Sequence, residues 1–208
     1  MYNKIQYISQ GSSIDEQLLN IEQVLDAGCE WLQLRYKNGS KGEVLQLALS
    51  VRKIIDNYNC RLIINDHPEI VKEVDADGVH LGLNDMPVAV ARVIIGNDKI
   101  IGGTANTLKD VLQRHTEQCD YVGLGPFQFT TTKEKLSPIV GLEGYKVIIS
   151  QLNELQVTIP VFAIGGIEQE DIGTILQTGI YGVALSGLIT RHSQKKQLFN
   201  ELYTLCSH

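Results

Sequence analysis

Three hydroxyl side chains and a lysine follow a glycine–proline pair near the middle of the chain. The pair Gly125-Pro126 ends an apolar segment, and Thr130, Thr131, Thr132 and Lys133 come shortly after it. Short hydroxyl donors beside a compact cation suit a phosphorylated ligand. A solvated polar loop accounts for the same residues equally well. This run alone therefore leaves a phosphate site and a surface loop as equal alternatives.

A second set of polar residues lies near residue 35. Gln33, Arg35 and Lys37 alternate there with the apolar residues Leu34 and Tyr36. Side chains two residues apart on a strand point to the same side, so these three would share one face. A strand covered by helices buries apolar side chains outward, which makes a surface strand the weaker explanation. We expect all three to point into a ligand site. There Arg35 would hold a diphosphate as a fork and Lys37 as a point charge.

Two aspartates follow predicted strands, and three other acids precede strands. Asp66 follows Ile63-Ile64-Asn65, and Asp85 lies just before a helix that Pro87 helps to start. Each could instead cap the helix that comes after it. Two carboxylates on neighbouring loops suit Mg²⁺, which keeps several waters and shares its other positions with phosphate oxygens. We therefore predict that this pair binds Mg²⁺. The acids that precede strands are predicted to lie at the opposite, structural face of the barrel: Glu30, Asp77 and Asp120.

All these residues lie near the ends of short β-branched runs that alternate with amphipathic segments. Eight such units predict a closed (β/α)₈ TIM barrel, an α/β fold with parallel strands whose chemistry sits where the strands end. An open doubly wound sheet is the alternative, but it rarely uses so many equal units. The predicted strands are 4–8, 31–36, 61–65, 78–82, 100–104, 121–125, 161–165 and 182–186, and the predicted helices include 14–27, 42–58, 107–116 and 171–178.

Three other strand ends carry small or polar residues. The fifth strand ends at Thr104, and Asn106 follows before Thr107, which is a candidate helix cap. The seventh and eighth strands end in Gly165-Gly166 and Ser186-Gly187. Barrels often bind phosphate at this position through backbone N–H groups, although a tight turn with positive φ also explains the glycines. We predict a phosphate site there.

Several residues with reactive side chains receive no predicted role in chemistry. We expect His80 to be a packed core histidine and His67 to lie outside the direct ligands of the ion. Trp31 is expected to pack, and the basic run 191–196 is expected to be a solvated helix face. The cysteines lack the spacing of a zinc site or a disulfide framework and are interpreted as small hydrophobes: Cys29, Cys60, Cys119 and Cys206.

The composition indicates one domain over residues 1–208. The chain is 43% hydrophobic and 20% charged, which is enough to bury a core without a second module. A net charge of −6 argues against a nucleic-acid surface. We see no membrane span and no signal peptide, so we expect a cytoplasmic protein without a membrane partner. The oligomeric state stays open, with a homo-oligomer as one outcome.

Six motifs, in order along nearly the whole chain, resemble those of the thiamine-phosphate synthase family. They are residues 33–37, 64–66, 78–82 with Asp85, 123–126, 130–133 and 163–167. The family is a (β/α)₈ barrel that joins 4-amino-2-methyl-5-hydroxymethylpyrimidine diphosphate to hydroxyethylthiazole phosphate and releases pyrophosphate. The resemblance thus implies a transferase of thiamine biosynthesis that acts on two small molecules and uses Mg²⁺.

The resemblance also implies a role for each matching residue. Mg²⁺ would be bound by Asp66 and Asp85, and catalysis would involve Arg35, Lys133 and Thr104, the last on the pyrimidine side. The pyrimidine diphosphate would be held by Gln33, Arg35, Lys37, Asn65 and Lys133, and the thiazole phosphate by Thr130, Thr132, Gly166, Ser186 and Gly187. The chain departs from the family pattern at three positions. The family often has Ser where this chain has Thr104, His where it has Asn106, and Ser where it has Gly187.

The implied reaction needs no nucleophile from the protein, because the thiazole nitrogen attacks and pyrophosphate leaves. The ring amino group can delocalise the pyrimidinylmethyl cation, so we expect a dissociative displacement in a site that excludes water and stabilises charge. Two alternatives remain open. One is a thiazole tautomerase-like isomerase with the same barrel, which does not need the acid pair. The other is a non-catalytic barrel that binds a phosphorylated ligand.

Overall fold

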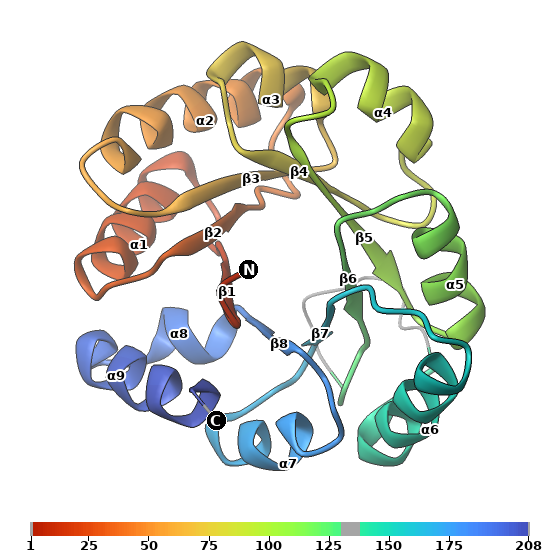
Figure 1. Ribbon diagram of the computed structural model, residues 1–208. Helices are drawn as coiled ribbons and strands as arrows, with labels where there is room; N and C mark the ends of the chain where they lie inside the picture. Colours follow the sequence, from red (N-terminus) through yellow and green to blue (C-terminus); the bar gives the residue numbers. More distant parts are fainter. Residues whose placement is uncertain (1, 130–137, 208) are drawn as a thin grey trace.

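The computed structural model describes residues 2–129 and 138–207, and its centre is a closed barrel of parallel strands (Figure 1). Each strand pairs with the next, and β1 pairs with β8 to close the sheet. The predicted barrel is confirmed, and closure excludes the open doubly wound sheet. The strands are β1 Ile5–Ile8, β2 Trp31–Leu34, β3 Arg61–Asn65, β4 Gly78–Leu81, β5 Ile100–Ala105, β6 Tyr121–Leu124, β7 Val161–Ile164 and β8 Gly182–Leu185.

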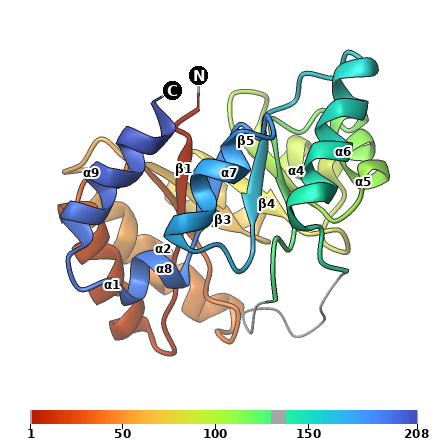
Figure 2. The same ribbon diagram turned by 90° about the horizontal axis from the view of Figure 1, so that it is seen from below.

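Helices follow the strands and surround the barrel (Figure 1). Figure 2 shows both chain termini at one end of the molecule. Within the described ranges, every helix is too short or too polar to cross a bilayer. The helices are α1 Ile14–Asp26, α2 Lys41–Ile55, α3 Pro68–Val74, α4 Val88–Ile95, α5 Leu108–Thr116, α6 Gly141–Glu154, the 3₁₀ turn η1 Gln169–Asp171, α7 Ile172–Leu176, α8 Gly187–Arg191 and α9 Lys195–Cys206.

Side-chain hydrogen bonds determine where two of the helices begin. At α5 the Thr107 hydroxyl accepts from the backbone N–H of Asp110 at 3.2 Å, and the Asp110 carboxylate accepts from the N–H of Thr107 at 2.9 Å. Ser40 and Glu43 form the same reciprocal pair at the start of α2. Such capping boxes satisfy N–H groups that have no partner inside the helix. The predicted cap at Thr107 is confirmed.

The barrel interior is filled by aromatic side chains near the strand starts. Trp31 lies 5.0 Å from Tyr121 and 5.1 Å from Phe162, centroid to centroid, and all three are fully buried. The prediction that Trp31 packs is confirmed. The alternate residues of the strands face outward into the main hydrophobic core beneath the helices, where Cys29, Cys119 and Cys206 are also buried.

The acids that precede strands stabilise the start of the barrel. The Asp77 carboxylate accepts from the backbone N–H of Leu62 at 2.7 Å. The Asp120 carboxylate accepts from the N–H of Ile101 at 2.8 Å and pairs with Arg92 at 3.0 Å. These contacts hold neighbouring strands in register. They agree with the predicted structural face.

Apart from shifts of one to three residues at other element boundaries, three predicted segments differ from the structure. Strand β2 ends at Leu34, two residues earlier than predicted, so Arg35 and Lys37 lie beyond the strand. The predicted helix 171–178 is the shorter α7, and the 3₁₀ turn η1 precedes it. The basic run 191–196 is not one helix face, because His192 adopts an extended backbone (φ −68°, ψ 128°) that separates α8 from α9.

Candidate active site

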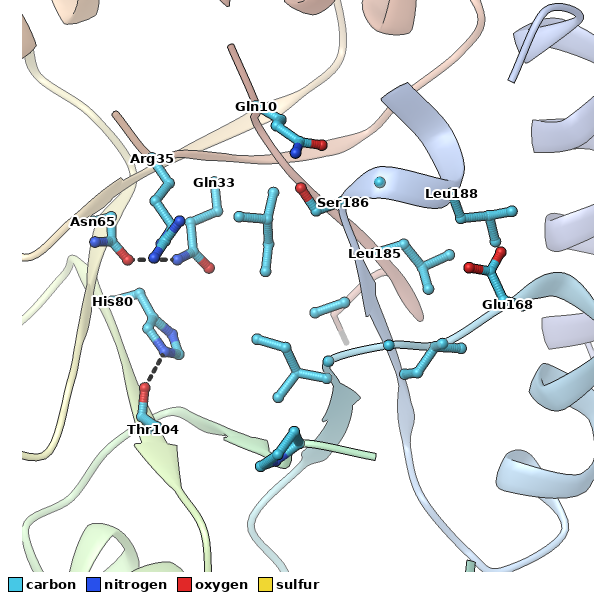
Figure 3. A pocket seen from close by; sticks show the side chains of 18 of the residues that line it. Gln10, Gln33, Arg35, Asn65, His80, Thr104, Glu168, Leu185, Ser186 and Leu188 are labelled. Atoms are coloured by element: carbon cyan, nitrogen blue, oxygen red, sulfur yellow. Dashed lines mark hydrogen bonds between the residues drawn. The ribbon is translucent and has the colours of Figure 1, made fainter. Parts of the chain in front are cut away.

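A cavity of about 300 Å³ opens where the strands end (Figure 3). Its walls come from several loops that follow different strands, as expected for the carboxyl end of a barrel. Predicted site residues that line it are Gln33, Arg35, Asn65, Thr104, Gly166, Ser186 and Gly187. Residues that line it without having been predicted include Gln10, Phe129, Glu168 and Arg191.

Asp66 and Asp85 come together at the ends of β3 and β4. Burial raises the pKa of Asp66 to about 7, and the Asp85 carboxyl group beside it contributes, while Arg35 and Lys37 oppose the rise. The structure therefore brings together the two acids and two cations of the prediction. Apart from the undescribed residues, the chain has no group of three or more candidate metal ligands.

Neither aspartate caps a helix, which removes the competing explanation for this pair. The N-caps of α3 and α4 are His67 and Pro87, and neither makes a side-chain cap hydrogen bond. The Asp85 carboxylate instead accepts from the backbone N–H of Gly82 at 2.5 Å. Asp66 has a positive φ of 66°, and its N–H donates to the carbonyl of His80 at 2.9 Å. Both acids are thus held by the loops on which they lie.

The acid pair fits a divalent cation. The partly buried Asp66 carboxylate and the exposed Asp85 carboxylate repel each other, which contributes to the raised pKa of Asp66, and a cation beside them would relieve that repulsion. Two protein ligands leave most of an octahedral shell to water and substrate oxygens, which is the arrangement that Mg²⁺ favours.

The polar residues of the second strand take different positions from those predicted. Gln33 points inward from β2, and its amide donates to the Asn65 side-chain oxygen at 2.8 Å (Figure 3). Arg35 also lines the cavity, with its backbone N–H bonded to the Ser9 hydroxyl at 2.9 Å. Burial lowers the pKa of Arg35, and Asp66 opposes that shift. The prediction that all three residues share one strand face is therefore wrong, because the strand ends before Arg35 and Lys37. Arg35 still lines the cavity, and the charge of Lys37 still lowers the pKa of Asp66.

Thr104 and His80 are joined by a hydrogen bond beneath the cavity. The Thr104 hydroxyl lies 3.0 Å from Nε2 of His80 (Figure 3). His80 is 5% exposed, so the prediction of a buried histidine is confirmed, but its ring also lines the cavity. Asn106, the next departure from the family pattern, donates from its amide to the carbonyl of Gly125. That bond connects the ends of β5 and β6.

The opposite wall combines a glycine turn with two unpaired polar atoms. Gly166 has a φ of 73°, and a Cβ there would lie 2.8 Å from the carbonyl oxygen of Phe129, so only glycine fits. Within the described ranges, the Ser186 hydroxyl and the Gln10 side-chain oxygen are buried without a hydrogen-bond partner. Both residues line the cavity and lie side by side in Figure 3. A buried polar atom of this kind is satisfied by a ligand or water.

Arg191 and Glu168 lie at the cavity and are 3.6 Å apart, Nη2 to Oε1. Arg191 is the last residue of α8 and its side chain is 67% exposed, so it is a solvated helix residue as predicted, but it also borders the cavity. Gln10 could have been found from the sequence by the same strand-end rule as Asp66, since it follows β1 by two residues. Nothing in the sequence signals the pairing of Arg191 with Glu168.

The residues Thr130, Thr132 and Lys133 lie outside the described part of the chain. The segment before them is bonded to the end of β7. Phe127 donates its N–H to the carbonyl of Ile164 at 2.9 Å, and Gln128 donates to Gly165 at 3.0 Å. Phe129 then lines the cavity. The described part of this segment therefore ends at the cavity wall.

Comparison with known proteins connects the chain to one family. The sequence profile described as Thiamine monophosphate synthase matches residues 6–189. The chain is 55% identical over 202 residues to the thiamine-phosphate synthase of Flavobacterium psychrophilum (97% of this chain, 98% of the relative), and 49% identical to that of Flavobacterium johnsoniae (97% and 95%). The structure of thiamine phosphate pyrophosphorylase from Pyrococcus furiosus matches with a TM-score of 0.82 at 28% identity, covering 98% of this chain and 95% of that one. This chain belongs to the thiamine monophosphate synthase family.

Proposed function

We propose that residues 1–208 form one catalytic domain, a thiamine-phosphate synthase. The reaction joins 4-amino-2-methyl-5-hydroxymethylpyrimidine diphosphate to hydroxyethylthiazole phosphate and releases pyrophosphate. The observation that carries the proposal is the acid pair Asp66–Asp85, which lies beside Arg35 and Lys37 at the end of the barrel. A site with two acids and two cations at a strand end suits a diphosphate that arrives with a metal ion.

The pyrimidine diphosphate occupies the side of the cavity formed by β2 to β5. Gln33 and Asn65 orient each other through their 2.8 Å hydrogen bond, and Arg35 presents its guanidinium to the phosphates. Lys37 and Lys133 supply two more cations. Asp66 and Asp85 would hold Mg²⁺, which would supply positive charge to neutralise the departing pyrophosphate.

The protein contributes electrostatics and positioning to the displacement. Arg35 and Lys133 stabilise the leaving group, so the bond from the pyrimidine methylene carbon to the diphosphate oxygen can break early. The cavity wall contributed by Ile8, Ile164 and Leu185 excludes water that would otherwise trap the cation. Thr104 contacts the pyrimidine from the floor of the cavity. The thiazole nitrogen then attacks from a held position.

The thiazole phosphate occupies the side formed by β7 and β8. There Gly166 and the Ser186-Gly187 turn line the cavity and offer backbone N–H groups and a hydroxyl. The unpaired Ser186 hydroxyl supports this assignment, since a phosphate oxygen would give it the partner that it lacks. Thr130 and Thr132 complete this side.

A coupled pyrophosphate assay tests the proposed function. Purified protein is incubated with Mg²⁺ and both substrates, and with each substrate alone. We expect pyrophosphate and thiamine phosphate to form in equal amounts, and only when both substrates are present. Thiazole isomerisation without pyrophosphate would identify a tautomerase, and ligand binding without any turnover would identify a non-catalytic barrel. Either result would reject the proposal.

A further inference from the structure

Three neighbouring strands place His80, Gly102 and Tyr121 in one row inside the barrel. In the register of the sheet, His80 of β4 is opposite Gly102 of β5, which is opposite Tyr121 of β6. A Cβ at position 102 would lie 2.1 Å from the Tyr121 ring. Because Gly102 has no side chain, Tyr121 reaches across β5, and its hydroxyl lies 3.1 Å from Nδ1 of His80.

The partners of the Tyr121 hydroxyl determine the direction of this hydrogen bond. The Gln6 side-chain amide donates to Tyr121 Oη at 3.1 Å, so one lone pair of that oxygen is used. Burial raises the pKa of Tyr121 well above its usual range, so the hydroxyl keeps its proton. Among the described residues, His80 Nδ1 is the other hydrogen-bond partner of this hydroxyl, so we infer that Tyr121 donates its proton and Nδ1 accepts it.

An unprotonated Nδ1 places the ring proton of a neutral His80 on Nε2. Nε2 is 3.0 Å from the Thr104 hydroxyl oxygen, so in this tautomer His80 donates and Thr104 accepts. The hydroxyl proton of Thr104 is thereby left for the cavity that this residue lines. The Thr104 hydroxyl, which could otherwise either donate or accept, is thus left to act as a donor toward the cavity.

We propose that Tyr121 is a positioning residue that acts through His80 to make Thr104 a hydrogen-bond donor to the substrate. The inference deepens the proposed function and rests on it for the identity of the acceptor, a ring nitrogen of the pyrimidine. A ring nitrogen accepts a hydrogen bond, whereas the neighbouring amino group donates, so a fixed donor selects one orientation of the ring.

Tyr121 could instead have only a structural role in the core, and a test must distinguish that role from positioning of Thr104. Its ring packs on Trp31 and Phe162 at centroid distances of 5.0 and 5.6 Å, so removing the whole side chain would disturb the core. Tyr121→Phe keeps the ring and removes only the hydroxyl. The matched control is Tyr145→Phe, which removes an equally buried hydroxyl that donates to the carbonyl of Leu124 at 2.9 Å.

The first measurement is the tautomer of His80 by nitrogen-15 NMR of the intact protein, which requires neither substrate nor turnover. We expect the proton on Nε2 in the unmodified protein and in Tyr145→Phe. In Tyr121→Phe, Nδ1 loses its donor, and we expect the proton to shift toward Nδ1. A proton on Nδ1 in the unmodified protein would overturn the proposal even if every variant failed to fold.

The second measurement is a double-mutant cycle on kcat/KM for the pyrimidine diphosphate. We expect Tyr121→Phe and Thr104→Val each to lower kcat/KM by about tenfold, and the double variant to lose no more than Thr104→Val alone. If Tyr121→Phe lowered kcat/KM equally in the unmodified protein and in Thr104→Val, Tyr121 would have a structural role, and the proposal would be contradicted. The tautomer is measured without turnover. A wrong assignment of the reaction would therefore leave the expected tautomer in place, whereas a wrong assignment of Tyr121 would change it.

Discussion

The chemistry that we propose for this protein depends on a small set of charged residues held by loops. Asp66 shows this best, because its pKa rises to about 7 under the combined effect of burial and the neighbouring Asp85 carboxyl group. An acid that only capped a helix would be stabilised in its charged form. The raised pKa of Asp66 therefore reflects burial and a second carboxyl group, and not a helix cap.

The acid pair gives the first prediction. Asp85→Ala should lower turnover by at least about tenfold, because one of two protein ligands of Mg²⁺ is lost. The coupled pyrophosphate assay at saturating substrates measures the effect. Asp98→Ala, which removes an acid near the opposite end of the barrel, is the control and should retain normal turnover. Near-normal activity in Asp85→Ala would contradict the metal assignment.

A second prediction concerns Lys133, which lies outside the described residues. Lys133→Ala should also lower turnover by at least about tenfold, because a cation that stabilises the leaving pyrophosphate is lost. The control is Lys146→Ala on α6, where the ammonium group forms an exposed pair with Glu143 at 2.6 Å. If both variants were equally active, Lys133 would have no part in the site.

At the scale of elements, the strand order does most of the positioning. The carboxyl ends of β2, β3 and β4 bring Arg35, Asp66 and Asp85 together from three separate parts of the sequence. The amino-terminal ends carry acids that bond to backbone N–H groups of neighbouring strands. One end of the barrel thus carries contacts that hold the strands in register, and the other carries the cavity.

The row across β4, β5 and β6 gives a prediction about stability. Gly102→Ala should lower the free energy of unfolding by about 1–3 kcal/mol, because the new methyl group meets the buried Tyr121 ring. Gly173→Ala in α7, where a Cβ has no neighbour within 4 Å, is the matched control and should not destabilise the protein. Denaturant unfolding measures both variants. Equal stability of the two would mean that Gly102 does not make room for Tyr121.

At the scale of the whole molecule, the sequence predicted the barrel because every strand–helix unit repeats the same alternation. It predicted Asp66, Asp85 and Thr104 because polar residues at strand ends share one face of a barrel. The helix boundary at His192 and the approach of Arg191 to Glu168 depend on how loops pack, which periodicity does not encode. The role of Gly102 depends on strand register, which became known only from the folded sheet.

The central claim is that one divalent ion joins the two aspartates to the diphosphate of the pyrimidine substrate. Titration calorimetry of that substrate into the protein, with Mg²⁺ and with a chelator, tests it most directly. We predict that Mg²⁺ strengthens binding at least about tenfold in the unmodified protein, roughly 1.4 kcal/mol, and has little effect in Asp66→Asn or Asp85→Asn. Equal affinity with Mg²⁺ and with the chelator, or full Mg²⁺ dependence in both variants, would contradict the account.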